Sequence, residues 1–179
     1  TGTAALPNGD HSSGVRISNS PDNLIGGTQP AQRNLISGGY PGYGVWIVGT
    51  SATGNRVLGN YIGTNAAGTA PLPNLIGVRI WASNNTVGGA QPGEGHVISG
   101  NRYGSNVEIF DGGSGASGNR IQGNYIGTDA TGSFAVDTNV LGAIGITISA
   151  DNNLIGGAWV RFDRFGNVIS GNPADGIII

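Results

Sequence analysis

The chain of 179 residues contains no cysteine, no methionine and no lysine, so all eight of its basic residues are arginine. Without cysteine, the chain can form no disulfide, no thiolate nucleophile and no cysteine-ligated metal site. Charged residues make up only 10% of the chain, and the formal net charge is −2. No basic stripe therefore indicates a nucleic-acid partner. Apolar runs are short as well: none approaches the ~20 residues of a membrane-spanning helix, which predicts no membrane insertion.

Glycine, in contrast, is abundant, with 35 residues, but it lacks the G-X-Y period that collagen requires. A longer segment repeats instead. Residues 54–65 read GNRVLGNYIGTN and residues 118–129 read GNRIQGNYIGTD, with nine of the twelve positions identical. Self-similarity at such a distance is the signature of a repeat architecture.

Three shorter motifs recur around these segments. Each alternates apolar with small or polar residues over four or five positions and is bounded by Gly or Asn, which is the pattern of a short strand between turns. The motifs are GVRI and its variants, beginning at residues 14, 44, 77, 106, 145 and 176; NLIGG, at 23, 85 and 153; and NLISG, at 34, 96 and 167. Each interval between GVRI motifs holds two further strand motifs, so one repeat unit contains three strands.

These spacings predict an all-β fold for residues 1–179, a single domain formed by a right-handed, single-stranded parallel β-helix of about five turns. Equivalent strands of successive turns should pair at ~4.8 Å, and the handedness follows the general preference for right-handed crossovers. β-Branched residues fill a buried pleated surface with few rotamers. The expected inward ladders are Val15, Val45, Val78, Val107, Ile146 and Ile177, and Ile17, Ile47, Ile80, Ile109, Ile148 and Ile179.

The corners of such a coil are expected at Gly and Asn, which tolerate positive φ. Stacked Asn side chains can also bond along the axis. Two such positions are Asn23, Asn85 and Asn153, and Asn60 and Asn124. His96 replaces the Asn of the NLISG motif, which indicates a corner residue. Loops at 65–74 and 129–139 should line one edge, and residues 1–4 align with 67–70, so we expect a start within a repeat and no end caps.

The tandem motifs resemble the right-handed parallel β-helix (pectate-lyase-like) superfamily. More narrowly, the segments YIGTN and YIGTD are similar to the IGTDxxG repeats of large secreted or surface-displayed bacterial proteins. The resemblance covers residues 14–179 and implies a right-handed coil and an extracellular or cell-surface location. It is specific for fold but not for function, because this fold hosts lyases, hydrolases, epimerases, adhesins and filaments.

The catalytic patterns of that superfamily are not matched. The resemblance to pectate lyases would imply a basic proton abstractor beside calcium-binding acids, but the chain has no lysine. The resemblance to polygalacturonases would imply an Asp-Asp pair and an RxK segment, and both are missing. We therefore assign no catalytic residue, no metal and no cofactor. Glu108 and Asp111 are interpreted as a solvated strand end, and Asp129 and Asp137 as acids that tie a loop by turn hydrogen bonds rather than hold a cation.

The candidate site is instead a face of the GVRI strands. Its outward positions form two columns, one of Arg16, Trp46, Arg79, Glu108, Thr147 and Ile178, and one of Ser18, Val48, Trp81, Phe110 and Ser149. Exposed aromatic residues cluster at recognition surfaces, so the predicted binding residues are Trp46, Arg79, Trp81, Glu108 and Phe110. The alternative is that Arg16, Trp46 and Arg79 form a stabilising cation–π ladder.

The sequence thus predicts a non-catalytic, extracellular structural or adhesive module. Its partners would be copies of itself or neighbouring repeats, stacked through open ends into a filament or within a longer surface protein, and also a polysaccharide. The alternative is a carbohydrate-active β-helix of the lyase, hydrolase or epimerase kind, or its glycan-binding scaffold. An ice-binding solenoid is disfavoured because no TxT ladder repeats on one face.

Overall fold

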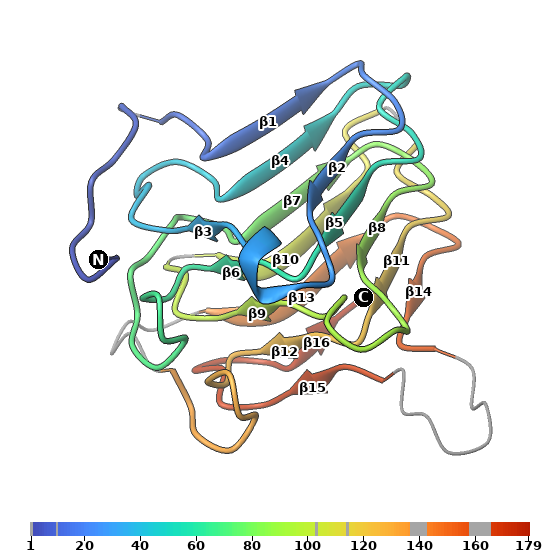
Figure 1. The fold of residues 1–179 in the computed structure, drawn as a ribbon. Helices are drawn as coiled ribbons and strands as arrows, with labels where there is room; N and C mark the ends of the chain where they lie inside the picture. The colour runs from blue at the N-terminus through green and yellow to red at the C-terminus, as the bar shows by residue number, and fades with distance from the viewer. Residues whose placement is uncertain (1, 10, 103, 114, 137–142, 158–165) are drawn as a thin grey trace.

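The computed structural model describes residues 2–9, 11–102, 104–113, 115–136, 143–157 and 166–179. Its strands form three parallel sheets, which we name A, B and C (Figure 1). Sheet A consists of β1 (Val15–Ser18), β4 (Val45–Val48), β7 (Val78–Trp81), β10 (Ser105–Phe110), β13 (Ile144–Ser149) and β16 (Ile177–Ile178). Sheet B consists of β2 (Leu24–Gly26), β5 (Arg56–Leu58), β8 (Thr86–Gly88), β11 (Arg120–Gln122) and β14 (Leu154–Ile155). Sheet C consists of β3 (Leu35–Ile36), β6 (Tyr61–Ile62), β9 (Val97–Ile98), β12 (Tyr125–Ile126) and β15 (Val168–Ile169).

The chain visits sheets A, B and C in turn and then returns to sheet A one level further along the stack. In Figure 1 the strands of each sheet run in order from blue near β1 to red near β16. Every strand pairs in parallel with its equivalent in the next turn, which confirms the predicted parallel β-helix. A short 3₁₀ turn, η1 (Pro30–Gln32), joins β2 to β3. Among the described residues, no helix is long and apolar enough to cross a membrane.

The interior is built from ladders of β-branched residues, as predicted, although Ile179 of the second predicted ladder lies outside the strands and is exposed. In sheet A, Val15, Val45, Val78, Val107, Ile146 and Ile177 occupy one register position, and Ile17, Ile47, Ile80, Ile109 and Ile148 occupy another. Sheet B adds Ile25, Val57, Val87, Ile121 and Ile155, and sheet C adds Ile36, Ile62, Ile98, Ile126 and Ile169. The members in the middle turns are fully buried. No single turn could bury these faces alone, so the turns stabilise one another by stacking.

The corner between sheets A and B carries a continuous asparagine ladder. Its members are Asn23, Asn55, Asn85, Asn119 and Asn153. The backbone N–H of each of the first four donates to Oδ1 of the next, at 2.9–3.0 Å. The sequence analysis found Asn23, Asn85 and Asn153 but not Asn55 and Asn119, which fill the alternate rungs. The ladder therefore has a rung in every turn.

The corner between sheets B and C carries a second ladder, formed by Asn34, Asn60, His96, Asn124 and Asn167. The same bond repeats here: the N–H of His96 donates to Oδ1 of Asn124 at 3.0 Å. His96 is fully buried, which confirms its prediction as a corner residue. Buried polar groups at both corners are therefore satisfied by the adjacent turn.

The two long loops also stack on each other. Isolated antiparallel bridges join Thr64 to Pro71 and Thr128 to Ala135 at the base of each loop. Ala130 N–H donates to the Gly68 carbonyl at 3.0 Å, and Ala66 N–H donates to the Gly2 carbonyl at 3.3 Å. The loops and residue 2 thus lie along one edge, as predicted; residues 137–139 of the second loop lie outside the described residues.

A column of residues with positive φ precedes the first ladder, and at this position a polar residue and glycine alternate from turn to turn. Asp22, Asn84 and Asn152 have φ of 57°, 58° and 57°, and the turns between them use Gly54 and Gly118 at 70° and 69°. A Cβ atom on Gly54 would collide with Asp22 Oδ1, and one on Gly118 would collide with Asn84 Oδ1. Each polar side chain lies against the backbone of the equivalent position in the next turn, so that position must be glycine. The alternation of a polar residue and glycine at this position follows from this packing.

Gly118→Ala should therefore be destabilising for two reasons that can be separated. Alanine at positive φ costs about 1–2 kcal/mol, and the collision with Asn84 adds to that cost. We expect the free energy of unfolding, measured by urea denaturation, to fall by more than ~2 kcal/mol.

The matched control is the double variant Asn84→Gly/Gly118→Ala, in which the collision is removed but the backbone strain remains. We expect the free energy of unfolding of the double variant to be about 1 kcal/mol higher than the losses of the two single variants would predict if they were additive. Strict additivity of the two substitutions would show that the side chain of Asn84 does not dictate glycine in the next turn.

Candidate functional site

The outward face of sheet A brings the five predicted binding residues together. Trp46 pairs in register with Arg79, and Arg79 pairs with Glu108. Trp81 lies beside Val48, and Phe110 beside Ser149. Both outward columns of the sequence analysis are therefore confirmed as neighbours on adjacent strands. The register of a parallel sheet fixes this, because the side-chain period is two and the inward ladders are strongly specified.

The aromatic rings of this face contact one another in a row that crosses three strands. Ring centroids are 5.5 Å apart between Tyr43 and Trp46, 5.8 Å between Trp46 and Trp81, and 5.4 Å between Trp81 and Phe110. The Trp46 and Trp81 rings meet edge to face, at 88°. Such pairs are favourable beyond their buried area. We call Arg16, Tyr43, Trp46, Arg79, Trp81, Glu108 and Phe110 the sheet A strip.

Arginine side chains lie over the ring faces of the strip. The Arg16 guanidinium carbon is 4.4 Å from the Trp46 ring centroid. The Arg79 guanidinium is 4.4 Å from the Trp81 ring and 4.8 Å from the Tyr43 ring, and it also donates a hydrogen bond to the Tyr43 hydroxyl. The alternative of the sequence analysis, cation–π stabilisation, is therefore present, although Arg79 lies over Trp81 and Tyr43 rather than over Trp46.

Tyr43 is the member of the strip that the sequence analysis missed. It lies two residues before Val45, outside the alternating strand pattern, so the two-residue period gave no orientation for its ring. Its position just before a GVRI-type motif was the signal available in the sequence.

Glu108 is tied to Arg79 within the strip. Arg79 Nε lies 2.5 Å from Glu108 Oε2, and the two side chains are only 17% and 18% exposed. Burial raises the pKa of the Glu108 carboxyl, against the opposing charge and hydrogen bond of Arg79. The interpretation of Glu108 as a solvated strand end was therefore wrong, because the neighbouring strand places a cation beside it. Asp111 Oδ1, in contrast, accepts the N–H groups of Gly113 and Gly115 in an exposed turn.

The other acids are used in loops or salt bridges. Asp129 accepts hydrogen bonds from Thr131 Oγ1 and from the N–H groups of Ser133 and Phe134. Burial raises the pKa of its carboxyl, but these bonds outweigh that effect and the net pKa lies below its usual value. This confirms the loop-tying interpretation of Asp129; Asp137 lies outside the described residues. Across the described part of the chain, no group of three or more His, Asp or Glu residues could hold a metal ion.

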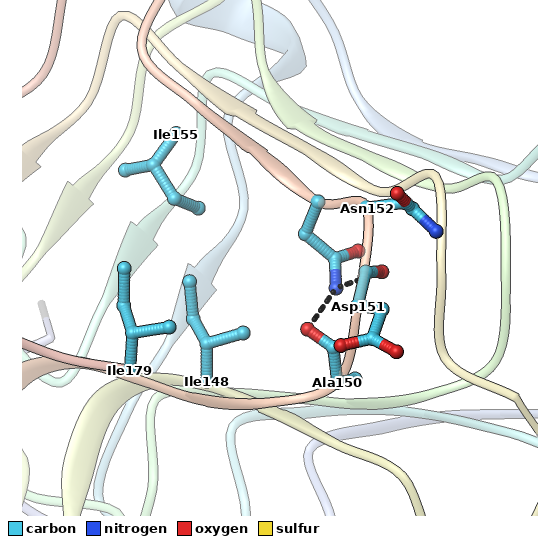
Figure 2. A pocket seen from close by; sticks show the side chains of 7 residues that line it. Ile148, Ala150, Asp151, Asn152, Ile155 and Ile179 are labelled. Atoms are coloured by element: carbon cyan, nitrogen blue, oxygen red, sulfur yellow. Dashed lines mark hydrogen bonds between the residues drawn. The ribbon is translucent and has the colours of Figure 1, made fainter.

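One hollow lies beside the corner that follows β13. It has a volume of about 320 Å³ and is lined by Ile148, Ala150, Asp151, Asn152, Asn153, Ile155 and Ile179. Figure 2 shows the three isoleucines on one side and Ala150, Asp151 and Asn152 on the other. Nδ2 of Asn153 donates to the carbonyls of Ala150 and Asp151. Asp151 is the single carboxylate of this lining, whereas glycoside hydrolysis uses two. The hollow thus continues the apolar interior and has no catalytic pair.

No family model, curated protein or solved structure matches the chain. The similarity to the pectate-lyase-like superfamily therefore stays a prediction from the motifs. Function is inferred below from the contacts of the chain's own residues.

The geometry of the strip predicts a stability role for Trp81. Trp81→Val removes two ring contacts and the cation–π contact with Arg79, but it keeps the residue that the same column carries at Val48. These contacts sum to about 2 kcal/mol, which corresponds to a fall in Tm of roughly 4–8 °C for a chain of this size.

The matched control is Ser149→Ala, in the same column but outside the ring contacts, which should leave Tm unchanged. Calorimetry of the three proteins checks the expectation. An unchanged Tm in Trp81→Val would show that the strip adds nothing to stability and would leave recognition as its role.

Proposed function

We propose that the chain is a non-catalytic, extracellular or cell-surface β-helix module with a structural or adhesive role. The proposal rests on the partners of three ionisable groups whose pKa is shifted from its usual value, all of which lie within the protein. His96 is enclosed in a corner ladder, Asp129 ties a loop, and Glu108 is paired with Arg79. Each group is thus held by the protein itself.

Catalysis by this fold would need a different arrangement. A general acid or base must reach the substrate within hydrogen-bond distance, and a glycosidase places two carboxylates about 5–10 Å apart around the scissile bond. In the described structure, Glu108 faces Arg79 and Asp111 caps a turn. Glu108 and Asp111, which lie three residues apart, are therefore both engaged with partners inside the protein.

The adhesive part of the proposal concerns the sheet A strip. Phe110 is 39% exposed at one end of the row of rings, and the exposed Arg16 lies over the Trp46 ring. An apolar ring and a cation on one flat face suit a polysaccharide with anionic groups, since exposed aromatic and arginine residues mark recognition surfaces. The same feature supports the second candidate, a glycan-binding scaffold of the carbohydrate-active kind.

A panel of neutral and acidic polysaccharides tests both candidates. We expect binding without turnover: retention on an acidic polysaccharide, at least fivefold weaker in Phe110→Ser, and no new reducing ends or unsaturated products. Serine is the matched replacement because Ser149 occupies the same column in the next turn.

Turnover by the wild-type chain would contradict the non-catalytic proposal. Retention that is equal in wild type and Phe110→Ser would remove the strip as the adhesive surface and leave the structural role alone.

The structural part of the proposal concerns how further turns add to the stack. Each of the three sheets presents edge strands, such as β1 and β16 in sheet A. The backbone groups of an edge strand are available for pairing with a further strand. Neighbouring β-helix repeats or copies of the chain would supply such strands.

Electron microscopy of the purified chain, beside its mass in solution, tests this part. Long unbranched fibres with a ~4.8 Å axial repeat would show that copies of the chain pair through their sheet edges. Single short particles with a monomeric mass would contradict self-association and leave neighbouring repeats as the partner.

A further inference from the structure

In the ladder between sheets B and C, His96 occupies a position that asparagine occupies in all four of the remaining rungs. The Nδ2 groups of Asn60, Asn124 and Asn167 donate to the carbonyls of Ile25, Val87 and Ile121, which share one register position of sheet B. In the rung of His96, Nε2 lies 2.6 Å from the carbonyl of Val57, the equivalent residue. The Nε2–H group therefore donates the bond that the asparagine amide donates elsewhere.

The other ring nitrogen reproduces the other asparagine bond. The N–H of Asn60 donates to Nδ1 of His96 at 2.9 Å, as the N–H of Asn34 donates to Oδ1 of Asn60 at 3.0 Å. Nδ1 must therefore be an acceptor while Nε2 carries the proton. Both requirements together hold only for the neutral imidazole in one tautomer.

The surroundings of His96 offer no place for a positive charge. The residue is fully buried, and burial lowers the pKa of its imidazole to about 4, against the opposing bonds to the carbonyls of Val57 and Asn60. The ring nitrogens bond to main-chain groups. The charged or titratable side chains on the segments around it are Arg33, Arg56, Tyr61, Glu94, Arg120 and Tyr125.

The nearest of these groups in the chain, Glu94, is already engaged. Glu94 Oε1 accepts a bond from Arg56 at 3.1 Å, and Oε2 accepts the N–H of Gln91 at 3.0 Å. Arg33 Nε donates to the carbonyl of Gly59, next to Asn60. The protonated ring would therefore have a cation, and no free carboxylate, beside the corner at Asn60.

We infer that the corner at His96 is an acid-operated latch, in which protonation of Nδ1 expels the N–H of Asn60 and opens the stack between the turn of β5–β6 and the turn of β8–β9. Nδ1–H and the Asn60 N–H are both donors, so the bond between them is lost on protonation. The remaining acceptor near Nδ1 is the Asn60 carbonyl at 3.3 Å, a longer distance than the 2.9 Å of the bond that is lost. The inference goes beyond the proposed function and is independent of any ligand.

The direction of the pH effect follows from the ring's pKa. It lies at about 4 in the folded chain and near 6.5 when the imidazole is exposed. The folded state thus binds fewer protons than the unfolded state between these values. The contribution of His96 to stability is complete above pH 6.5 and is lost as the pH falls from 6.5 to 4.

The test compares the wild type with His96→Asn, which installs the residue of the other rungs. Between pH 7.5 and pH 4.5 we expect the unfolding constant of the wild type to increase roughly 50-fold more than that of the variant. Amide hydrogen exchange at pH 4.5 should locate the opening: the N–H groups of Asn60, Tyr61 and Val97 should exchange faster in the wild type than in the variant, and those of sheet A should not.

Equal pH dependence in the two proteins would overturn the inference, as would unchanged exchange at Asn60. A second measurement does not depend on how well the variant folds. Titration of the wild type by NMR follows the imidazole signals of His96 and of the exposed His11 in one sample. A His96 signal that titrates near pH 6.5 in the folded chain would refute the latch.

Discussion

The interaction on which the structure depends is the hydrogen bond between a corner residue and the corner residue of the next turn. Parallel strands of two to six residues bring few ladder bonds of their own, and each turn buries its apolar face only against its neighbours. The asparagine ladders add a buried, fully paired polar contact at two corners of each turn. An unpaired buried amide at a corner would be costly. The ladders therefore favour one alignment of each turn on the next and hold the β-branched columns in register.

The same constraint explains the composition. Sharp corners need residues that accept positive φ, and a polar side chain at one corner covers the backbone of the next turn. Asp22 over Gly54 and Asn84 over Gly118 show that a polar residue and glycine alternate at the position just before the first ladder. The sequence difference between successive turns at this position thus has a steric cause. Charge is scarce because the corners are satisfied by amides, which need no counter-ion.

Periodicity predicted the fold, the register and the face of each strand residue, since a period of two leaves only two choices per side chain. It placed Trp46, Arg79, Trp81, Glu108 and Phe110 on one face correctly. It could not give side-chain rotamers, so the pairing of Arg79 with Glu108 and the placement of Arg79 over Trp81 and Tyr43 were not foreseen. Tyr43, Asn55 and Asn119 were missed because their roles depend on contacts between turns, which a single strand motif does not contain.

The ladder also shows that the fold does not require a histidine at position 96. Asparagine makes both corner bonds at three of the five rungs between sheets B and C, those of Asn60, Asn124 and Asn167. The imidazole of His96 makes the same two bonds. Packing therefore does not require histidine there. Histidine differs from asparagine in that its side chain can bind a proton, so it introduces a titratable group into this buried corner. The substitution of one rung thus converts a static element into a titratable one without changing the fold.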